Sequence, residues 1–404
     1  MSQHFKLVFA AFIGFLPLFS HAQSAYISGQ DSARNPITVA VPFVSFAPDS
    51  RGAAMGDAGV ASSADEYSTQ WNNGKLTFIE DDMGFSFSYS PWLGNIVDDM
   101  SLNFLTFHKK LNRIETIGAS LRYFDLGEIQ LTNSNGDAIG LENPREASVD
   151  FTYSRKLSEN IGVGLTGRYI WSNLSGNITG APDAKPGQSI AIDLGFYYTK
   201  DIIFRGKNSN VAFGAHLSNF GRKITYSNDS NEDFIPTNLR VGGAFTTEID
   251  PYNSITLLLD FNKLLVPTPP LYLLDGEGEF EIDANGDPII DAGKDPNRPL
   301  LSGTFGSFTD APNGFREEMQ EIMISTGLEY KYRSAFAVRV GYFHEHVNKG
   351  NRQYFTAGLG FKYQVFGIDF SYLVPRENNH PLGDTLRLSF TFGFDAKDEE
   401  PTLN

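Results

Sequence analysis

Large apolar residues alternate with small or polar ones in one segment after another from Met83 onward. In the last segment, 385–394, every even position is large and apolar and every odd position is not. Successive side chains of a strand point to opposite faces, so this period of two predicts half-buried strands rather than helices. The fourteen predicted strands are 83–92, 99–109, 113–125, 145–157, 160–173, 188–200, 210–219, 237–249, 253–263, 319–332, 334–347, 352–365, 367–374 and 384–395.

The connections between these strands are short on one side and long on the other. Those after even-numbered strands are mostly very short, as at 110–112 and 250–252, whereas those after the third, fifth, seventh and ninth strands are long. Outer-membrane barrels have short periplasmic turns and longer extracellular loops. We therefore predict an all-β fold: a 14-stranded antiparallel transmembrane β-barrel in the outer membrane, with both chain ends in the periplasm.

The two faces of the predicted strands differ in chemistry. The apolar and aromatic face is expected to contact lipid, and the other face to line the lumen. Lumen positions carry charges of both signs, so we expect a packed lumen with paired charges rather than an open pore of one sign. These charged lumen residues are Arg122, Asp150, Arg168, Asp193, Arg240, Asp260, Glu329, Arg339, Asp369 and Arg387.

The first residues resemble a secretory signal. Lys6 precedes an apolar run at 7–19, and Ser20-His21-Ala22 follows with the small–x–small pattern of a cleavage site. A charged start, a short apolar core and small residues predict a signal peptide over 1–22. No later run of about 18 apolar residues predicts a membrane-spanning helix.

The amino-acid composition excludes several classes of function for this protein. The chain of 404 residues has 39 Gly, 13% aromatic residues and only 20% charged residues, which fits β structure with many turns. Zero Cys excludes a disulfide scaffold, a Cys-ligated metal and a thiol nucleophile. A net charge of −16 argues against a nucleic-acid partner.

Two motifs resemble known sites without completing them. The run 162–167 matches G-x-G-x-x-G but lies inside a predicted strand with no helix after it, so we interpret these glycines as small residues filling the lumen. His344 and His346 share a strand face, but no third ligand is close in sequence. No motif pairs a Ser with a His, and no enzyme, cofactor or resident metal is predicted.

The segment 283–294 could be a calcium-binding loop or a turn. Asp283, Asp287 and Asp291 have the spacing of such a loop. Pro288 stands where the loop needs Gly, and Lys294 where it needs Glu. A turn is favoured, with calcium as the alternative.

The segment before the barrel carries a recognisable motif. Pro48-Asp49-Ser50-Arg51 is followed by Ala-Met-Gly-Asp-Ala-Gly-Val-Ala at 54–61, by Ala64-Asp65-Glu66 and by Trp71-Asn72. This pattern resembles the N-terminal region of FadL-like outer-membrane barrels, and its variant is most similar to the PorV family of the type IX secretion system. The specific motif covers 45–80, and it departs from the family at 73–75, where Asn-Gly-Lys follows instead of a Pro-containing turn.

The resemblance implies a domain organisation. The segment 23–80 would fold into the lumen as a plug, 81–396 would form the barrel, and 397–404 would be a periplasmic tail. The implied plug residues are Pro48, Asp49, Arg51, Met55, Gly56, Asp57, Gly59, Trp71 and Asn72.

The resemblance also implies a non-enzymatic function. Such a protein would bind the giant translocon barrel of the type IX system and accept cargo through the cargo's C-terminal signal domain. It would then pass the cargo to a sortase-like attachment complex at the cell surface. The alternative is a FadL-type channel for hydrophobic small molecules, in which the plug moves.

The longest loop, 264–318, is the predicted site of partner contact. It holds eleven acidic and three basic residues, and it opens with an apolar, Pro-rich stretch. Exposed apolar surface of this size suggests a protein partner, and the alternative is that the stretch folds over the barrel's own rim. The predicted partner-binding residues are Leu264, Leu265, Pro269, Pro270, Leu271, Tyr272, Leu273 and Leu274.

Overall fold

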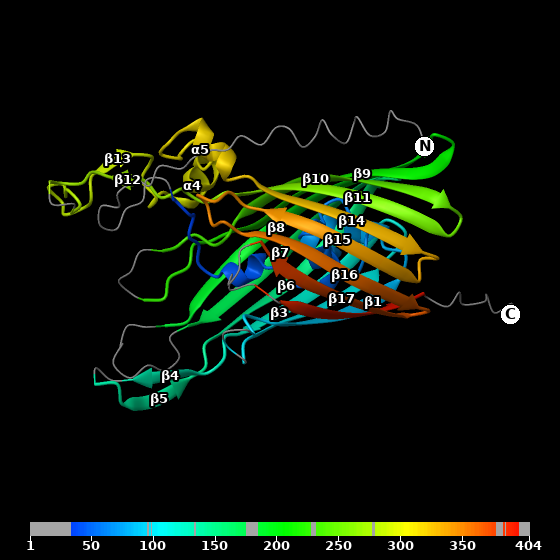
Figure 1. Ribbon diagram of the computed structural model, residues 1–404, viewed down its shortest axis with the longest axis horizontal. Helices are drawn as coiled ribbons and strands as arrows, with labels where there is room; N and C mark the ends of the chain where they lie inside the picture. The colour runs from blue at the N-terminus through cyan, green and yellow to red at the C-terminus, as the bar shows by residue number, and fades with distance from the viewer. Residues whose placement is uncertain are drawn as a thin grey trace, which may run out of the picture.

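The chain forms a closed antiparallel barrel of fourteen strands (Figure 1). The computed structural model describes residues 34–94, 97, 99–132, 135–174, 185–227, 232–276, 279–376, 383 and 385–395. The predicted signal peptide 1–22 and tail 397–404 lie outside the described residues. The barrel strands are β1 (Met83–Pro91), β2 (Ser101–Lys110), β3 (Glu115–Asp125), β6 (Arg145–Ser158), β7 (Ile161–Asn173), β8 (Gly187–Phe204), β9 (Lys207–Gly221), β10 (Asn238–Asp250), β11 (Asn253–Leu264), β14 (Met323–Tyr332), β15 (Phe336–His344), β16 (Gln353–Tyr363), β17 (Phe366–Pro375) and β18 (Leu386–Phe394).

Each barrel strand pairs with its neighbours in chain order, and β1 closes the barrel against β18. All fourteen predicted strands are therefore confirmed, with two notable boundary errors. Residues 319–320, predicted as strand, end the helix α5 (Phe315–Gln320), because acidic side chains of this helix are bound by lysines of the rim. β8 and β9 are longer than predicted and meet at Arg205-Gly206, since this hairpin is exposed at its tip and loses the alternation there.

The inward and outward faces of the wall are as predicted. Arg168, Asp193 and Asp260 are buried in the lumen, whereas Phe151 and Ile190 are exposed on the outer face. Several inward charges are paired, as predicted: Arg168 lies 2.8 Å from Asp150 and 3.0 Å from Asp193. Other inward charges are bound by neutral groups of the plug: Arg122 donates to Phe43 O at 2.8 Å, and Asp260 accepts from Gly59 N at 2.7 Å. Buried charges need such partners, so these contacts fit a packed lumen.

The two ends of the barrel differ. Figure 1 shows short turns at one end, the short-turn end, and long excursions at the other, the long-loop end. The long-loop end carries the hairpin of β4 (Ile129–Thr132) and β5 (Ala138–Glu142), the small sheet of β12 (Leu271–Tyr272) and β13 (Ile290–Ala292), and the helices α4 (Leu300–Gly306) and α5. Among the described residues, no helix is long and apolar enough to span a membrane.

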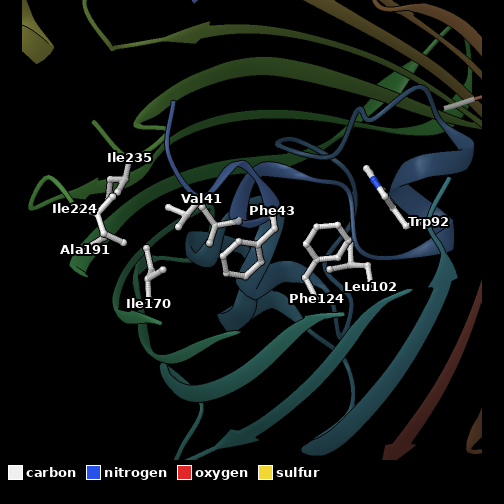
Figure 2. Close-up of a cluster of buried hydrophobic side chains, with 10 residues drawn as sticks. Val41, Phe43, Trp92, Leu102, Phe124, Ile170, Ala191, Ile224 and Ile235 are labelled. Atoms are coloured by element: carbon white, nitrogen blue, oxygen red, sulfur yellow. The ribbon is translucent and has the colours of Figure 1, made fainter. Parts of the chain in front are cut away.

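A plug of short helical segments fills the barrel. It contains η1 (Pro42–Ser45), α2 (Ser50–Ala54), α3 (Ser68–Trp71) and η2 (Asn73–Phe78), drawn in blue inside the strands (Figure 1). Figure 2 shows Val41 and Phe43 of the plug among wall residues such as Phe124 and Ile170. This apolar cluster holds the start of the plug at the long-loop end.

Wall glycines let the plug backbone approach the strands. A Cβ atom added at Gly164 would lie 2.5 Å from the carbonyl carbon of Asn73, and one added at Gly162 would collide with Gly74. Both glycines belong to the G-x-G-x-x-G match, and the prediction that its glycines fill the lumen is confirmed for these two. The prediction is wrong for the third, Gly167, because the alternation along β7 places it outside. The same strand has Gly167 on its outer face, where a Cβ atom would meet nothing within 4 Å.

We expect Gly164→Val to destabilise the seated plug by about 1–3 kcal/mol, because extra carbon atoms overpack a filled interior. The plug should become susceptible to protease in detergent while the strands stay folded, as read from gel mobility before and after heating. Gly167→Val on the same strand is the matched control and should behave like the wild type. Equal protease resistance of the two variants would contradict this packing.

Candidate functional site

Asp49 organises the centre of the plug. Its carboxylate caps α2 by accepting a hydrogen bond from Gly52 N at 2.7 Å and accepts another from Trp71 Nε1 at 2.6 Å. The indole ring lies against Gly52 and Gly59, where a Cβ atom would overlap it. Pro48 is buried just before the cap. The structure therefore brings Asp49, Gly52 and Gly59 together around one tryptophan.

Arg51 joins the plug to the barrel wall. Its guanidinium donates to Glu329 of β14 at 3.2 Å and to Asp65 of the plug at 2.7 Å. Glu329 also pairs with Arg339 at 2.7 Å, and Arg339 pairs with Asp369. These five residues form a continuous buried ion network, and removing one partner from such a network typically costs 3–5 kcal/mol.

The turn after α2 is fixed by the wall at β16. Gly56 has φ +67°, which favours glycine, and its N–H donates to Thr356 Oγ1 at 2.9 Å. Asp57 accepts a hydrogen bond from Tyr354 Oη at 2.6 Å. Met55 is buried against β14 and β15 at glycine positions of the wall. The Met-Gly-Asp part of the motif is thus a wall contact.

The end of the motif is also bound to the wall. The N–H groups of Gly59 and Val60 donate to Asp260 Oδ2 of β11 at 2.7 and 2.9 Å. Asn72 donates to Val60 O at 2.9 Å and to Phe196 O of β8 at 2.8 Å. All nine predicted plug residues lie in the lumen-filling segment, and several of them contact the wall directly.

Lys75 is a plug residue that sequence reasoning missed. Its ammonium is fully buried and donates to Gly59 O at 2.7 Å and to Ser62 Oγ at 2.8 Å. It follows Asn72, whose side chain accepts from Gly74 N at 3.0 Å and caps η2. The residues at 73–75, where the sequence departs from the family motif, therefore form a capped 3₁₀ turn with a buried lysine. That departure was the feature of the sequence from which a special role of Lys75 could have been predicted.

The long-loop end has a second buried ion network, which we call the α5 latch: Lys263, Glu317, Glu318, Glu321 and Lys349. Lys263 at the end of β11 binds Glu318 at 3.0 Å and also Glu321. Lys349, between β15 and β16, binds Glu321 at 3.0 Å and also Glu317. The latch therefore fastens α5 to the rim from two sides.

Glu317 shows the electrostatic strength of the latch. Burial alone would raise the pKa of its carboxyl. The hydrogen bond and positive charge of Lys349, with the N–H of Asn313, outweigh burial and hold the pKa of Glu317 below its usual value. The carboxylate is therefore ionised in the folded loop.

Because the latch takes its carboxylates inward, α5 presents its apolar residues outward. Phe315 is 79% exposed and Met319 is 51% exposed. Leu301 and Phe305 of α4 and Phe308 after it are exposed as well. We call these five residues the α4–α5 apolar face. Sequence reasoning missed it because acidic residues of a short helix are ordinarily assigned to the solvent side.

The predicted partner-binding stretch is divided by the structure. Leu265 and Pro270 are buried, Leu264 and Pro269 are half-buried, and Leu265 N donates to Thr237 O at 2.8 Å. This half matches the alternative expectation, because its apolar side chains cover the barrel's own rim, and a partner-binding role for the buried Leu265 and Pro270 does not fit. The second half is more open: Leu273 is exposed, and Leu271, Tyr272 and Leu274 are half-buried.

A cavity of about 440 Å³ lies between the plug and the long-loop end. Apolar walls come from residues such as Phe46, Trp92 and Phe343, and charged walls include Arg240 and Arg387. Nε of Arg387 has no hydrogen-bond partner among the described residues. The cavity is therefore amphipathic, with the plug as its floor.

The segment with calcium-loop spacing forms a turn. Asp283 Oδ1 accepts hydrogen bonds from the N–H groups of Asn285 at 2.8 Å and Asp287 at 3.0 Å. Within the described part of the chain, no group of three or more acidic or histidine side chains is placed to hold a metal ion.

We expect Lys349→Met to free α5, because Glu317 loses its buried cation while Glu321 keeps Lys263. Tryptic cleavage after the exposed Arg316 should accelerate at least tenfold. The control is Lys362→Met, which removes the half-exposed ion pair between Lys362 and Asp81 at 3.6 Å. It should leave the cleavage rate within twofold of wild type. An unchanged cleavage rate in Lys349→Met would show that the latch does not hold the helix.

The latch should also respond to acid. Since the pKa of Glu317 is lowered in the folded protein, its stabilising contribution is complete above its ordinary value of 4.5 and is lost as the pH falls through the lowered value. Hydrogen exchange of α5 amides, corrected for intrinsic rates, should therefore rise below about pH 4.5 while β-strand amides remain protected. Parallel behaviour of α5 and the strands would contradict this linkage.

Several solved structures are similar to this chain. They include the toluene transporter TbuX of Ralstonia pickettii, with 13% identity over 86% of this chain and 98% of that chain at a TM-score of 0.44. The P. putida toluene transporter TodX has 10% identity over 87% of this chain and 99% of that chain, at a TM-score of 0.48. A Pseudomonas aeruginosa FadL homologue has 11% identity over 89% of this chain and 100% of that chain, at a TM-score of 0.43. No curated protein matches.

A model of the family described as type IX secretion system protein PorV matches residues 29–271, more than half of the 404 residues. This range includes the complete plug motif and the strands from β1 to β11. The chain belongs to the PorV family of type IX secretion system outer-membrane proteins.

Proposed function

We propose that this protein is a non-enzymatic carrier of the type IX secretion system. It binds the giant translocon barrel, accepts cargo through the cargo's C-terminal signal domain and passes it to a sortase-like attachment complex. The long-loop end faces the cell exterior, and the short-turn end and both chain ends face the periplasm. Family membership supports the system, and the longer loops support this orientation.

The α4–α5 apolar face is the observation that carries the proposal of a partner. Five exposed large apolar residues on one loop favour an interaction site over ordinary surface. The latch holds this face in place before binding, so less conformational entropy is lost when a partner docks. We assign the contact with the translocon to this face together with the more open half of the predicted stretch, Leu271–Leu274.

The packed lumen supports a role based on surfaces. The plug contacts β11, β14 and β16 through Asp260, Glu329 and Thr356. A passage for small molecules would require this set of buried contacts to open. Binding to loops and rims requires no such opening.

A second candidate function rests on the amphipathic cavity of about 440 Å³. Its size falls within the range of small-molecule sites, and its mixture of aromatic and cationic walls suits a ligand with an apolar body and an anionic group. This observation favours the FadL-type alternative, in which the plug would move. The two functions predict different consequences when loops are changed, since a transport defect should follow from the cavity and not from α4 or α5.

We expect the triple variant Phe305→Ser, Phe315→Ser, Met319→Ser to reduce recovery of the translocon barrel from native membranes at least tenfold. Each side chain contributes on the order of 1.5–3 kcal/mol when it is buried by a partner. The readout is co-purification with the tagged protein, quantified by mass spectrometry, after confirming that the barrel is inserted.

The matched control is Ile139→Ser with Leu141→Ser in the β4–β5 hairpin, two exposed apolar residues on another long loop. It should retain the partner. Full recovery with the triple variant would remove the α4–α5 apolar face from the interface. Loss with the control alone would place the contact on the β4–β5 hairpin.

A further inference from the structure

The short-turn end has a wide groove that the carrier function does not use. It has a volume of about 1480 Å³ and lies between the β2–β3 turn, the β6–β7 turn and the base of the plug at Thr77 and Ile79. The two turns are neighbours because β3 pairs with β6, and Lys156 N donates to Ile114 O at 2.8 Å. We call this feature the basic groove.

The groove concentrates positive charge in an acidic protein. Its five cations are Lys109, Lys110, Arg113, Arg155 and Lys156, against three acids, Asp82, Glu159 and Asp395. The whole chain has a net charge of −16. The local excess is therefore opposite in sign to the rest of the molecule.

Several of these cations are available for a ligand. Lys109 and Arg113 are exposed and form no ion pair within the described residues. Arg155 lies 3.5 Å from Glu115 with about half of its side chain exposed, a pair that contributes little in water. Lys110 and Lys156 already have partners within the protein. Lys110 lies 3.3 Å from Asp82, and Lys156 lies 4.8 Å from the centroid of the Phe78 ring.

Apolar side chains stand among the cations. Leu157 is 62% exposed at the β6–β7 turn, and Leu111 and Ile114 are exposed at the β2–β3 turn. Cations next to exposed aliphatic groups provide both long-range attraction and apolar anchors. A ligand that fits this surface carries negative charges and apolar side chains together.

We propose that the basic groove binds an acidic polypeptide segment of a periplasmic partner. Charge complementarity selects an acidic ligand, and the volume exceeds the 300–1,000 Å³ typical of small-molecule sites. Lys109 and Arg155 continue the outward-facing series of their strands, whereas the rest of the lining reaches inward beneath the plug to Thr77. This inward part favours a water-borne polypeptide over a phospholipid. The periplasmic location rests on the orientation given under the proposed function.

The test uses purified full-length protein in lipid nanodiscs and two dye-labelled peptides. One peptide alternates glutamate with leucine, and the other alternates lysine with leucine. We expect the acidic peptide alone to bind by fluorescence anisotropy, with affinity falling as salt rises, because partly exposed charges are screened beyond about 10 Å at 0.1 M salt.

The variant Lys109→Ser, Arg113→Ser, Arg155→Ser should weaken binding at least tenfold. The matched control is Lys200→Ser, Arg205→Ser, Lys207→Ser, which removes three exposed cations from the β8–β9 hairpin at the same end. It should stay within twofold of wild type. Equal weakening by both variants, or no binding of the acidic peptide, would overturn the inference.

Two further arms identify a different occupant. If the peptide binds only after residues 396–404 are deleted, the groove belongs to the chain's own acidic C-terminal segment, and the partner proposal is overturned. If no peptide binds and the triple variant loses co-purified anionic phospholipid that the control variant retains, the groove is a lipid site, and the proposal is again overturned.

Orientation is tested separately with Leu157→Cys, which is the sole cysteine of the resulting chain. A membrane-impermeant maleimide should label it only after the outer membrane is permeabilised. Labelling in intact cells would overturn the orientation and this inference together. Failure of peptide binding with the expected labelling would overturn this inference alone.

Discussion

The fold depends on the close contact between the plug and the inner wall of the barrel. Glycines such as Gly164 and Gly341 remove side chains where the plug backbone meets the strands. The resulting contact excludes water, so every charge near it needs a partner. Arg51 meets this need by binding Glu329 of the wall and Asp65 of the plug. Packing and charge pairing therefore reinforce each other.

Because the lumen is filled, the interaction surfaces that we propose lie at the rims. At the long-loop end, the α5 latch uses buried lysines to turn carboxylates inward, which leaves Phe315 and Met319 facing out. At the short-turn end, cations gather on two neighbouring turns. At the long-loop end, ion pairs between buried charges stabilise the fold. At the short-turn end, exposed cations can attract other molecules.

The sequence predicted the strands and lumen charges well because a one-residue slip would invert every side chain of a strand. Arg168 and Asp193 could be assigned to the lumen from alternation alone. Contacts between distant segments could not be predicted: Lys75 meets Gly59, and Lys349 meets Glu317, through geometry that the barrel sets. Leu265 was misassigned as exposed because apolar residues in loops look alike whether they cover their own rim or a partner.

The central claim is that the plug stays seated while the protein works, and a locked plug tests it most directly. Thr69 Cγ2 lies 2.9 Å from the position of a Cβ atom at Gly118, so Thr69→Cys with Gly118→Cys places two thiols within disulfide reach. Delivery of a type IX cargo to the cell surface is measured in cells carrying the oxidised pair. The account predicts delivery equal to that of the wild type. Delivery that stops in the oxidised state and returns on reduction would contradict it.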